Sequence, residues 1–412
     1  MAGLAATNTP LAAAPLHPYR WMILAGVWLL YYSFGLTIAA MAPLVKPITE
    51  ELGLSHSAMG GILGAWPLVY IVAALPGGAF LDRVGIRKAL FLSILIIAAS
   101  AICRSISTGH LSLFLAVGLF GLGGPLVSVG APKAITLWFE GKERGVAMGL
   151  YITGPALGGV TALALTNSVV MPLVGGDWRV ALQVYAVFVL ATGVVWLFIS
   201  GNALAQEVER KVAAQEKKPQ FEIFVELIHM RPIQIVLVMS VGIFFYNHGL
   251  GNWLPEILRS RGMTPEAAGY WASVPTAMGV IGALIIPRLA VPERRVFLLL
   301  FLFICAGLGT QMMQNDPGLG LASGLILQGI TRTTMMTIMI MVLVDTKGIE
   351  AHSVGLASGL FFSAAEIGGV LGPLTVGIVA DLTGGFTVAL DMMSLICVAL
   401  IGMLVLLRRT TG

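Results

Sequence analysis

One apolar, glycine-rich stretch occurs twice in this chain and decides its fold. The first copy reads Gly145-Val-Ala-Met-Gly-Leu-Tyr-Ile-Thr-Gly-Pro-Ala-Leu-Gly-Gly-Val160, and the second reads Gly355-Leu-Ala-Ser-Gly-Leu-Phe-Phe-Ser-Ala-Ala-Glu-Ile-Gly-Gly-Val370. Seven positions are identical, where chance in a glycine-rich chain gives roughly one or two. The chain is therefore expected to consist of two similar halves.

Apolar runs long enough to cross a membrane flank both copies. The chain of 412 residues is 57% hydrophobic and only 11% charged, whereas soluble domains are about 25% charged. A bilayer core needs roughly 20 apolar residues per helix. Twelve runs meet this length, and they predict an all-α membrane protein. The runs are 21–44, 58–80, 88–107, 111–137, 145–171, 179–201, 233–255, 267–288, 296–314, 318–343, 353–380 and 386–407.

The basic residues predict the orientation of these spans. With both chain ends in the cytoplasm, 17 Lys and Arg fall in cytoplasmic segments and only four, Lys46, Arg179, Arg259 and Arg261, face outward. Because short cytoplasmic loops carry an excess of Lys and Arg, both termini are expected inside. The domain plan is then a cytoplasmic tail at 1–20, a six-helix bundle at 21–201, a charged linker helix at 202–232, a second bundle at 233–407 and a tail at 408–412.

Several functions are excluded by what the sequence lacks. The basic residues form no stripe, so a nucleic-acid partner is not expected. The three cysteines, Cys103, Cys305 and Cys397, lie in separate apolar runs, which offers neither a disulfide framework nor a metal site. No phosphate-binding loop or catalytic triad is present. We therefore expect no enzyme, no cofactor and no metal, and a monomer in the lipid bilayer.

The loop after the second span carries a family resemblance. It reads Gly78-Ala-Phe-Leu-Asp82-Arg83-Val-Gly85-Ile-Arg87-Lys88 and resembles the Gly-x-x-x-Asp-Arg-x-Gly-x-Arg-Lys signature of the major facilitator superfamily. The resemblance implies twelve helices in two six-helix bundles with a cavity between them. It also implies a cytoplasmic latch between the bundles, in which the glycines permit close approach and a tight turn. The expected latch residues are Gly78, Asp82, Arg83, Gly85, Arg87 and Lys88.

Two further segments favour different branches of that superfamily. The junction Leu137-Trp-Phe-Glu-Gly-Lys-Glu-Arg-Gly-Val-Ala-Met-Gly149 resembles branches that carry small anions: cyanate and nitrate/nitrite-type porters, organic-anion symporters and monocarboxylate carriers. The segment Gly154-Pro155-Ala-Leu-Gly158-Gly159 resembles the core of the drug/proton antiporter motif. Glycines on one helix face also serve close helix packing, and this structural interpretation has at least equal weight. Gly154, Pro155, Gly158 and Gly159 are then expected to be gating residues, on a closely packed surface about which one half rocks against the other.

Arg332 is the main candidate for binding an anion. It lies near the middle of the tenth span, where insertion of Arg costs roughly 2.5–3.5 kcal/mol. Glu366 lies at similar depth in the eleventh span. Two alternatives follow: a structural ion pair between them, or substrate binding by Arg332 with Glu366 as its resting counter-charge or as a proton carrier. Gln328, four residues before Arg332, is expected on the same helix face.

The remaining polar and aromatic candidates also have structural alternatives. His248 lies in the seventh span together with Asn247 and Asn252. Gly249 and Gly251 are expected to weaken the helix there, which would let it bend as a gating helix. The alternative is that His248 is a histidine of the buried core. Lys133 either attracts the substrate or extends to the membrane surface, and Arg104 is expected at that surface. Packing competes with substrate contact for the aromatic candidates, which are Tyr31, Tyr32 and Trp66.

These observations predict a secondary active transporter rather than an enzyme. The expected substrate is a small anion, an organic carboxylate or a cyanate-like species, moved across the cytoplasmic membrane by alternating access. Because a membrane that is negative inside opposes anion entry, a co-transported proton is the expected driver, with Glu366 or His248 as its carrier. The alternative is a proton-coupled exporter of lipophilic drugs.

Overall fold

The computed structural model describes residues 18–203, 205, 227–346, 349 and 354–411, and within them it contains twelve helical segments long and apolar enough to cross a membrane. The twelve predicted spans are thus confirmed, to within a few residues at most ends. Most of the predicted linker, 202–232, and nearly all of the N-terminal tail lie outside the described residues.

The first half contains the helices of spans one to six. Proline and glycine divide three of these spans into shorter pieces. The pieces are α1 (Tyr19–Ala39), η1 (Ala42–Leu44) and α2 (Val45–Leu52); α3 (His56–Leu63) and α4 (Ala65–Val84); α5 (Ile86–Ser105); α6 (His110–Trp138); α7 (Gly141–Tyr151), α8 (Thr153–Leu165), η2 (Thr166–Val170) and α9 (Met171–Leu173); and α10 (Trp178–Ser200).

The second half has longer, less interrupted helices. These are α13 (Arg231–Ser260), α14 (Pro265–Ile285) with η3 (Ile286–Leu289), η4 (Pro292–Arg294) with α15 (Arg295–Met312), α16 (Leu319–Val344), α17 (Val354–Thr383) and α18 (Thr387–Thr411). Helices α13, α14 and α17 each contain an internal proline. Neighbouring helices make such interruptions tolerable within a membrane.

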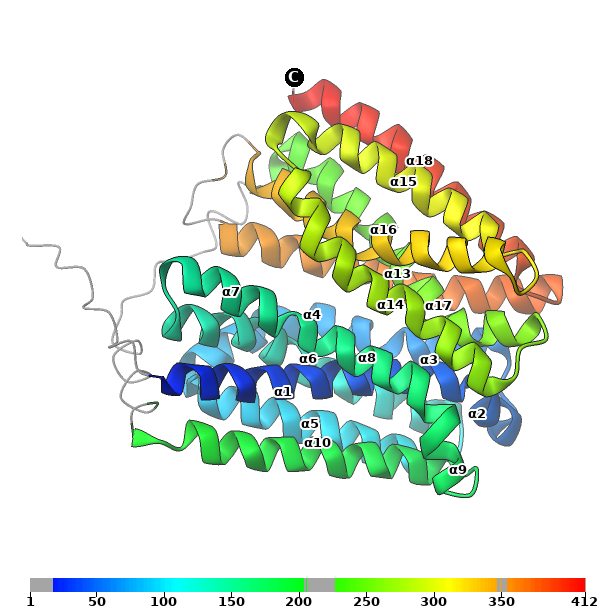
Figure 1. The fold of residues 1–412 in the computed structure, drawn as a ribbon, viewed down its shortest axis with the longest axis horizontal. Helices are drawn as coiled ribbons and strands as arrows, with labels where there is room; N and C mark the ends of the chain where they lie inside the picture. Colours follow the sequence, from blue (N-terminus) through cyan, green and yellow to red (C-terminus); the bar gives the residue numbers. More distant parts are fainter. Residues whose placement is uncertain (1–17, 204, 206–226, 347–348, 350–353, 412) are drawn as a thin grey trace, which may run out of the picture.

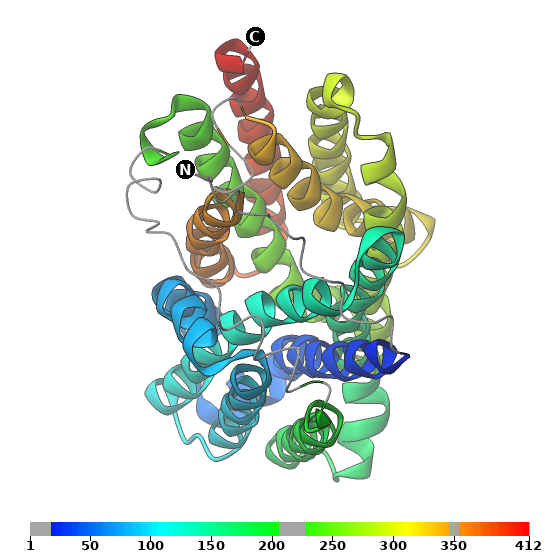
Figure 2. The same cartoon turned by 90° about the vertical axis from the view of Figure 1, so that its left-hand side faces the viewer.

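Figures 1 and 2 show the two halves as separate groups of helices, α1–α10 and α13–α18. We call the end where α1 begins and α18 ends the terminal end, and the opposite end the far end. In Figure 1, α15 and α18 run away from the first half as they approach the terminal end. The halves therefore approach one another at the far end and diverge toward the termini.

The repeated stretch sets the closest helix contacts inside each half. A Cβ at Gly158 would lie 2.1 Å from the carbonyl oxygen of Tyr32 in α1, and a Cβ at Gly368 would lie 2.0 Å from that of Val241 in α13. These glycines are equivalent positions of the two copies. Glycine is required at both because only the absence of a side chain lets the backbones touch.

Backbone contacts also join the two halves at the far end. A Cβ at Gly60 of α3 would lie 2.4 Å from the carbonyl oxygen of Pro373 in α17, and one at Gly269 of α14 would lie 2.4 Å from that of Leu163 in α8. Such backbone contacts are missing at the glycines nearer the terminal end. A Cβ at Gly78, Gly149 or Gly359 would meet nothing within 4 Å.

A single carboxylate bridges the halves at the far end. Asp381, in the last turn of α17, accepts hydrogen bonds from the backbone N–H of His56 (3.1 Å) and of Ser57 (2.7 Å), at the start of α3. It also accepts from the Nδ1–H of His56 at 2.9 Å and from the hydroxyl of Ser57. A negative charge is thus held at a helix N-terminus, where free N–H groups and the helix dipole favour it.

Replacing Gly368 by alanine tests the packing role of the repeat. The new methyl group must push α13 and α17 apart, at a cost of about 1–3 kcal/mol. We expect a lower midpoint of thermal unfolding for the purified protein in detergent. Gly359→Ala in the same helix is the matched control, since its Cβ meets open space and its midpoint should not fall. Equal midpoints for the two variants would contradict this packing role.

Candidate functional site

A cavity of about 390 Å³ lies between the two halves. Its volume is within the range of small-molecule sites in proteins. Helices α1, α4, α7 and α8 form one wall, and α13, α14 and α16 form the other. The lining residues are Gly35, Ile38, Ala39, Ala42, Trp66, Gly149, Ile152, Thr153, Pro155, Ala156, Gly159, Leu163, Asn247, His248, Gly251, Asn252, Leu254, Ala272, Pro275, Thr276, Val280, Ala283, Leu284, Arg332 and Thr333.

Among the described residues of this lining, Arg332 is the one Lys, Arg, Asp or Glu. Its guanidinium lies beside α13, where a Cβ at Gly251 would be 3.0 Å from one of its terminal nitrogens. The missing side chain at Gly251 therefore makes the space for the cation. One turn earlier, the amide of Asn247 donates to the backbone carbonyl of Arg332 at 3.3 Å, which fixes α13 against α16.

Glu366 lies beside His248 and forms no ion pair with Arg332. Its carboxylate is 5% exposed and lies 4.0 Å from His248 Nε2. Its Oε2 accepts no hydrogen bond from a described residue. Among the described residues no carboxylate forms an ion pair with Arg332, so the structural Arg332–Glu366 pair, one of the two sequence-based alternatives, is not formed.

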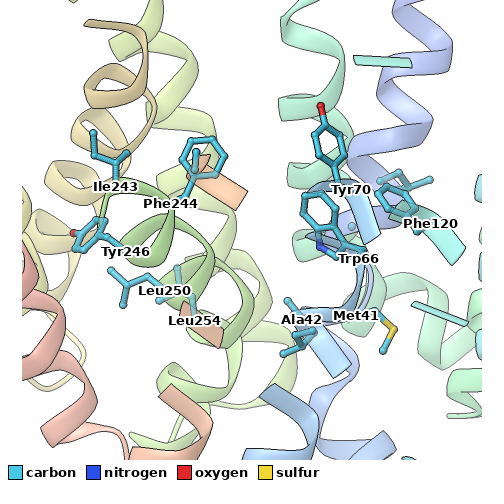
Figure 3. Close-up of a cluster of buried hydrophobic side chains, with 14 of the residues drawn as sticks. Met41, Ala42, Trp66, Tyr70, Phe120, Ile243, Phe244, Tyr246, Leu250 and Leu254 are labelled. Atoms are coloured by element: carbon cyan, nitrogen blue, oxygen red, sulfur yellow. The ribbon is translucent and has the colours of Figure 1, made fainter. Parts of the chain in front are cut away.

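His248 connects the two halves through its ring. It stacks on Trp66 of α4, with ring centroids 5.4 Å apart at 30°, and on Phe244 of its own helix, at 5.4 Å and 26°. Figure 3 shows Phe244 and Trp66 on facing helices of the two halves. His248 is thus held between an aromatic ring of each half while its Nε2 faces Glu366.

The seventh span differs from the sequence-based expectation. Helix α13 is continuous through Gly249 and Gly251, so these glycines do not break it. Gly249 instead packs against α17 and α18, where a Cβ would lie 2.3 Å from the Met393 methyl group. The expected Asn252 lines the cavity, and its amide donates to the His248 carbonyl at 2.9 Å.

Four predicted substrate-binding residues do not line the cavity. Gln328 is completely buried, and Tyr31 stacks face to face on Tyr151 at 5.7 Å and 7°. Tyr32 donates to the hydroxyl of Thr161 at 2.8 Å. Lys133 pairs with Asp82 of the expected latch. The structure therefore brings together Arg332, His248, Asn247, Asn252 and Trp66, and separates these four residues from them.

The expected latch segment forms contacts inside its own half. Asp82, near the end of α4, pairs with Lys133 of α6, and Gly85 adopts a φ of +86° between α4 and α5, which favours glycine. Arg83 and Lys88 are exposed, while the backbone carbonyl of Arg87 accepts from the indole of Trp196 at 3.1 Å. Gly85 makes the expected tight turn, but Gly78 faces open space rather than a neighbouring helix.

The antiporter-like segment has a packing role in this structure. A Cβ at Gly154 would lie 2.8 Å from the carbonyl oxygen of Trp28, and Pro155 presents its own carbonyl oxygen to Gly35. Gly158 contacts α1 as described above. Gly159 instead faces the cavity, where a Cβ would lie 3.6 Å from Thr276 of the other half.

Sequence reasoning missed three features. Arg104, expected at the membrane surface, is 1% exposed; it donates to the Thr37 carbonyl at 3.2 Å and lies over the Phe120 ring at 5.5 Å. The bridging role of Asp381 was not predicted, although an acid at a helix end is a usable signal. The threonines that line the cavity, such as Thr276, could not be recognised as lining residues from the sequence, because hydroxyl side chains are common in membrane helices.

No group of three or more His, Cys, Asp or Glu that could hold a metal is found in the part of the chain that the structure describes. Cys103, Cys305 and Cys397 are free thiols in the structure. The described lining presents the Arg332 guanidinium, amide groups, hydroxyls and aromatic faces, and the titratable side chains of His248 and Glu366 lie next to one another.

Comparisons with known proteins agree with this architecture. The chain is 25% identical to the hexuronate transporter of Bacillus subtilis (strain 168), over 89% of this chain and 88% of that protein. It is 24% identical to the D-galactonate transporter of Escherichia coli O6:H1, over 96% of this chain and 97% of that protein.

A solved structure shares the fold as well. It is the crystal structure of a bacterial homolog of the human lysosomal transporter Spinster, in an inward-facing and unoccupied conformation. It matches with a TM-score of 0.70 over 96% of this chain and 98% of that chain, at 17% identity. The sequence model of the Major Facilitator Superfamily matches residues 24–373. The chain therefore belongs to the Major Facilitator Superfamily and is a multi-pass membrane transporter, not an enzyme.

Proposed function

We propose that this protein is a secondary active transporter of an organic anion. The observation that carries the proposal is Arg332, which lines the cavity between the halves with no carboxylate paired to it among the described residues. A cation within a membrane-spanning helix that has no carboxylate partner among the described residues favours a ligand that supplies the negative charge. The two curated relatives above are named for carboxylate substrates, which supports the same class.

A drug exporter is the weaker alternative. Negative charge in the cavity favours binding of lipophilic cations, and the described lining residues include no Asp or Glu. The segment that resembles the antiporter motif packs α8 against α1. Both observations favour the organic-anion function.

Replacing Arg332 by glutamine tests the proposed role of this residue. At least one member of a panel of organic anions (galacturonate, galactonate, benzoate, sulfoacetate) is expected to raise the unfolding midpoint of the purified protein. We expect the Arg332→Gln variant to lose that response, with binding of the best anion weakened at least about 100-fold. Arg288→Gln is the control, because Arg288 is exposed outside the cavity. Stabilisation by cationic dyes alone would refute the proposed function.

Proton coupling is proposed to pass through Glu366. This carboxylate is buried within a membrane helix, with His248 Nε2 4.0 Å away and no hydrogen bond to its Oε2 from a described residue. A carboxylate in such a place is neutralised most easily by binding a proton. Entry of the anion together with a proton also avoids moving net negative charge against the membrane potential.

Glu366→Gln separates coupling from binding. The amide keeps the shape of the side chain but binds no proton in the physiological range. We expect uptake driven by a pH gradient in proteoliposomes to be lost, while exchange of internal for external anion continues. His248→Gln distinguishes the second candidate carrier. Gradient-driven uptake that survives in Glu366→Gln and is lost in His248→Gln would assign the proton to His248 instead.

Alternating access is proposed with the terminal end in the cytoplasm, as the distribution of Lys and Arg favours. The halves are closed at the far end by the glycine contacts and by Asp381. The described conformation then corresponds to an inward-facing state of a protein in the cytoplasmic membrane. Opening outward requires Asp381 to leave the start of α3.

Asp381→Ala is expected to favour outward opening. It removes hydrogen bonds to a charged group that stabilise the closed far end, each worth about 1.5–3 kcal/mol. A loss of about 1.4 kcal/mol already raises the population of the outward-open state tenfold. The measurement is labelling of Ala42→Cys, in the cavity lining, by a membrane-impermeant maleimide added outside cells, in a background without the native cysteines. We expect labelling about tenfold faster.

Asp391→Ala is the matched control. Asp391 also lies near the far end, but it accepts hydrogen bonds from Gln311 and Gln314 of its own half. Its removal should leave labelling unchanged. Equal labelling rates in the Asp381 and Asp391 variants would show that Asp381 does not hold the halves together.

A further inference from the structure

We propose that the transported anion is a monocarboxylate with an apolar body, not a polyhydroxylated sugar acid. The inference rests on the proposed function and narrows its substrate class. It follows from a difference between the two walls of the cavity.

The first-half wall offers almost no hydrogen-bonding side chain. Of its twelve described lining residues, ten are glycine, alanine, proline, isoleucine or leucine. The other two are Trp66, whose indole has a single N–H donor, and Thr153, whose hydroxyl already accepts from the Trp28 indole at 2.9 Å and donates to the Leu150 carbonyl at 2.7 Å. The nearby hydroxyls of Tyr31, Tyr70 and Tyr151 belong to residues outside the lining.

The second-half wall carries the polar groups. Arg332, Asn247, Asn252, Thr276 and Thr333 all line the cavity from this side. The Oδ1 of Asn247 is buried and accepts no hydrogen bond from a described residue. A ligand therefore finds its charge partner and nearly all of its hydrogen-bond partners on one side only.

This arrangement fits a ligand with one polar end. A carboxylate placed against Arg332 leaves the rest of the molecule against Ile38, Trp66, Ala156 and Leu163. Apolar carbon gains there from leaving water. Several ring hydroxyls on that side would give up their water and find at most the single N–H of Trp66 as a side-chain donor, which weakens binding. One added hydroxyl is rejected by an apolar pocket by up to about 100-fold, and a sugar acid carries several.

The test compares two acids of the same skeleton. Cyclohexanecarboxylate and D-galacturonate are both six-membered-ring monocarboxylates, and they differ mainly in the ring oxygen and the hydroxyl groups. Binding of each to the purified wild-type protein is measured by titration calorimetry and by the rise in unfolding midpoint. We expect cyclohexanecarboxylate to bind at least about 100-fold more tightly. Equal binding, or tighter binding of galacturonate, would overturn the inference while leaving the organic-anion function intact.

A wall variant links the preference to its proposed cause. Ile38→Asn places an amide in the first-half wall, and we expect it to reduce the preference for cyclohexanecarboxylate at least about tenfold. Leu289→Asn is the control, because Leu289 is 55% exposed and outside the lining. An unchanged preference in Ile38→Asn would also overturn the inference. Failure of both acids to bind, with stabilisation by cationic dyes, would instead refute the proposed function.

Discussion

Contact between helix backbones is the constraint on which this structure depends. In lipid there is no hydrophobic gain when two apolar helices meet, so they associate where small residues let their backbones pack closely. Gly158 lies against Tyr32 of α1, and Gly368 lies against Val241 of α13. The repeat thus appears in the fold as the same close contact made twice, once in each half.

These contacts explain where the cavity lies. Helices α8 and α17 are each held tightly to a helix of their own half. Their other faces meet the opposite half, where Gly60 approaches Pro373 and Gly269 approaches Leu163 at the far end. Between those contacts and the open glycines of the terminal end, the lining residues enclose the space that holds Arg332. The room for its guanidinium comes from Gly251, so small residues shape both the fold and the site.

Depth along each helix could be predicted from the sequence, but the direction of a side chain around its helix could not. Arg332 and Glu366 were recognised because charge within an apolar run is costly wherever it points. Gln328 and Tyr32 were misplaced because their contacts depend on which neighbouring helix packs on that face. Arg104 shows the same limitation: its position near a span end suggested the membrane surface, whereas the packing of α1 and α6 buries it. Tight turns were easier to predict from the sequence than side-chain directions. At Gly85, for example, the positive φ of the backbone itself favours glycine.

The two ends of the interface use a related local design with different partners. Asp82 is followed three residues later by Gly85 at φ +86°, and Asp381 is followed three residues later by Gly384 at φ +71°. In each case an acid lies in the last turn of a helix, directly before a glycine-dependent turn. Asp381 joins the halves at the start of α3, whereas Asp82 pairs with Lys133 of its own half. Gly78, one turn before Asp82, has open space beside it. The far-end acid is therefore bound across the interface while Gly78 faces open space, so one local design serves a contact between the halves at the far end and a contact within one half at the terminal end.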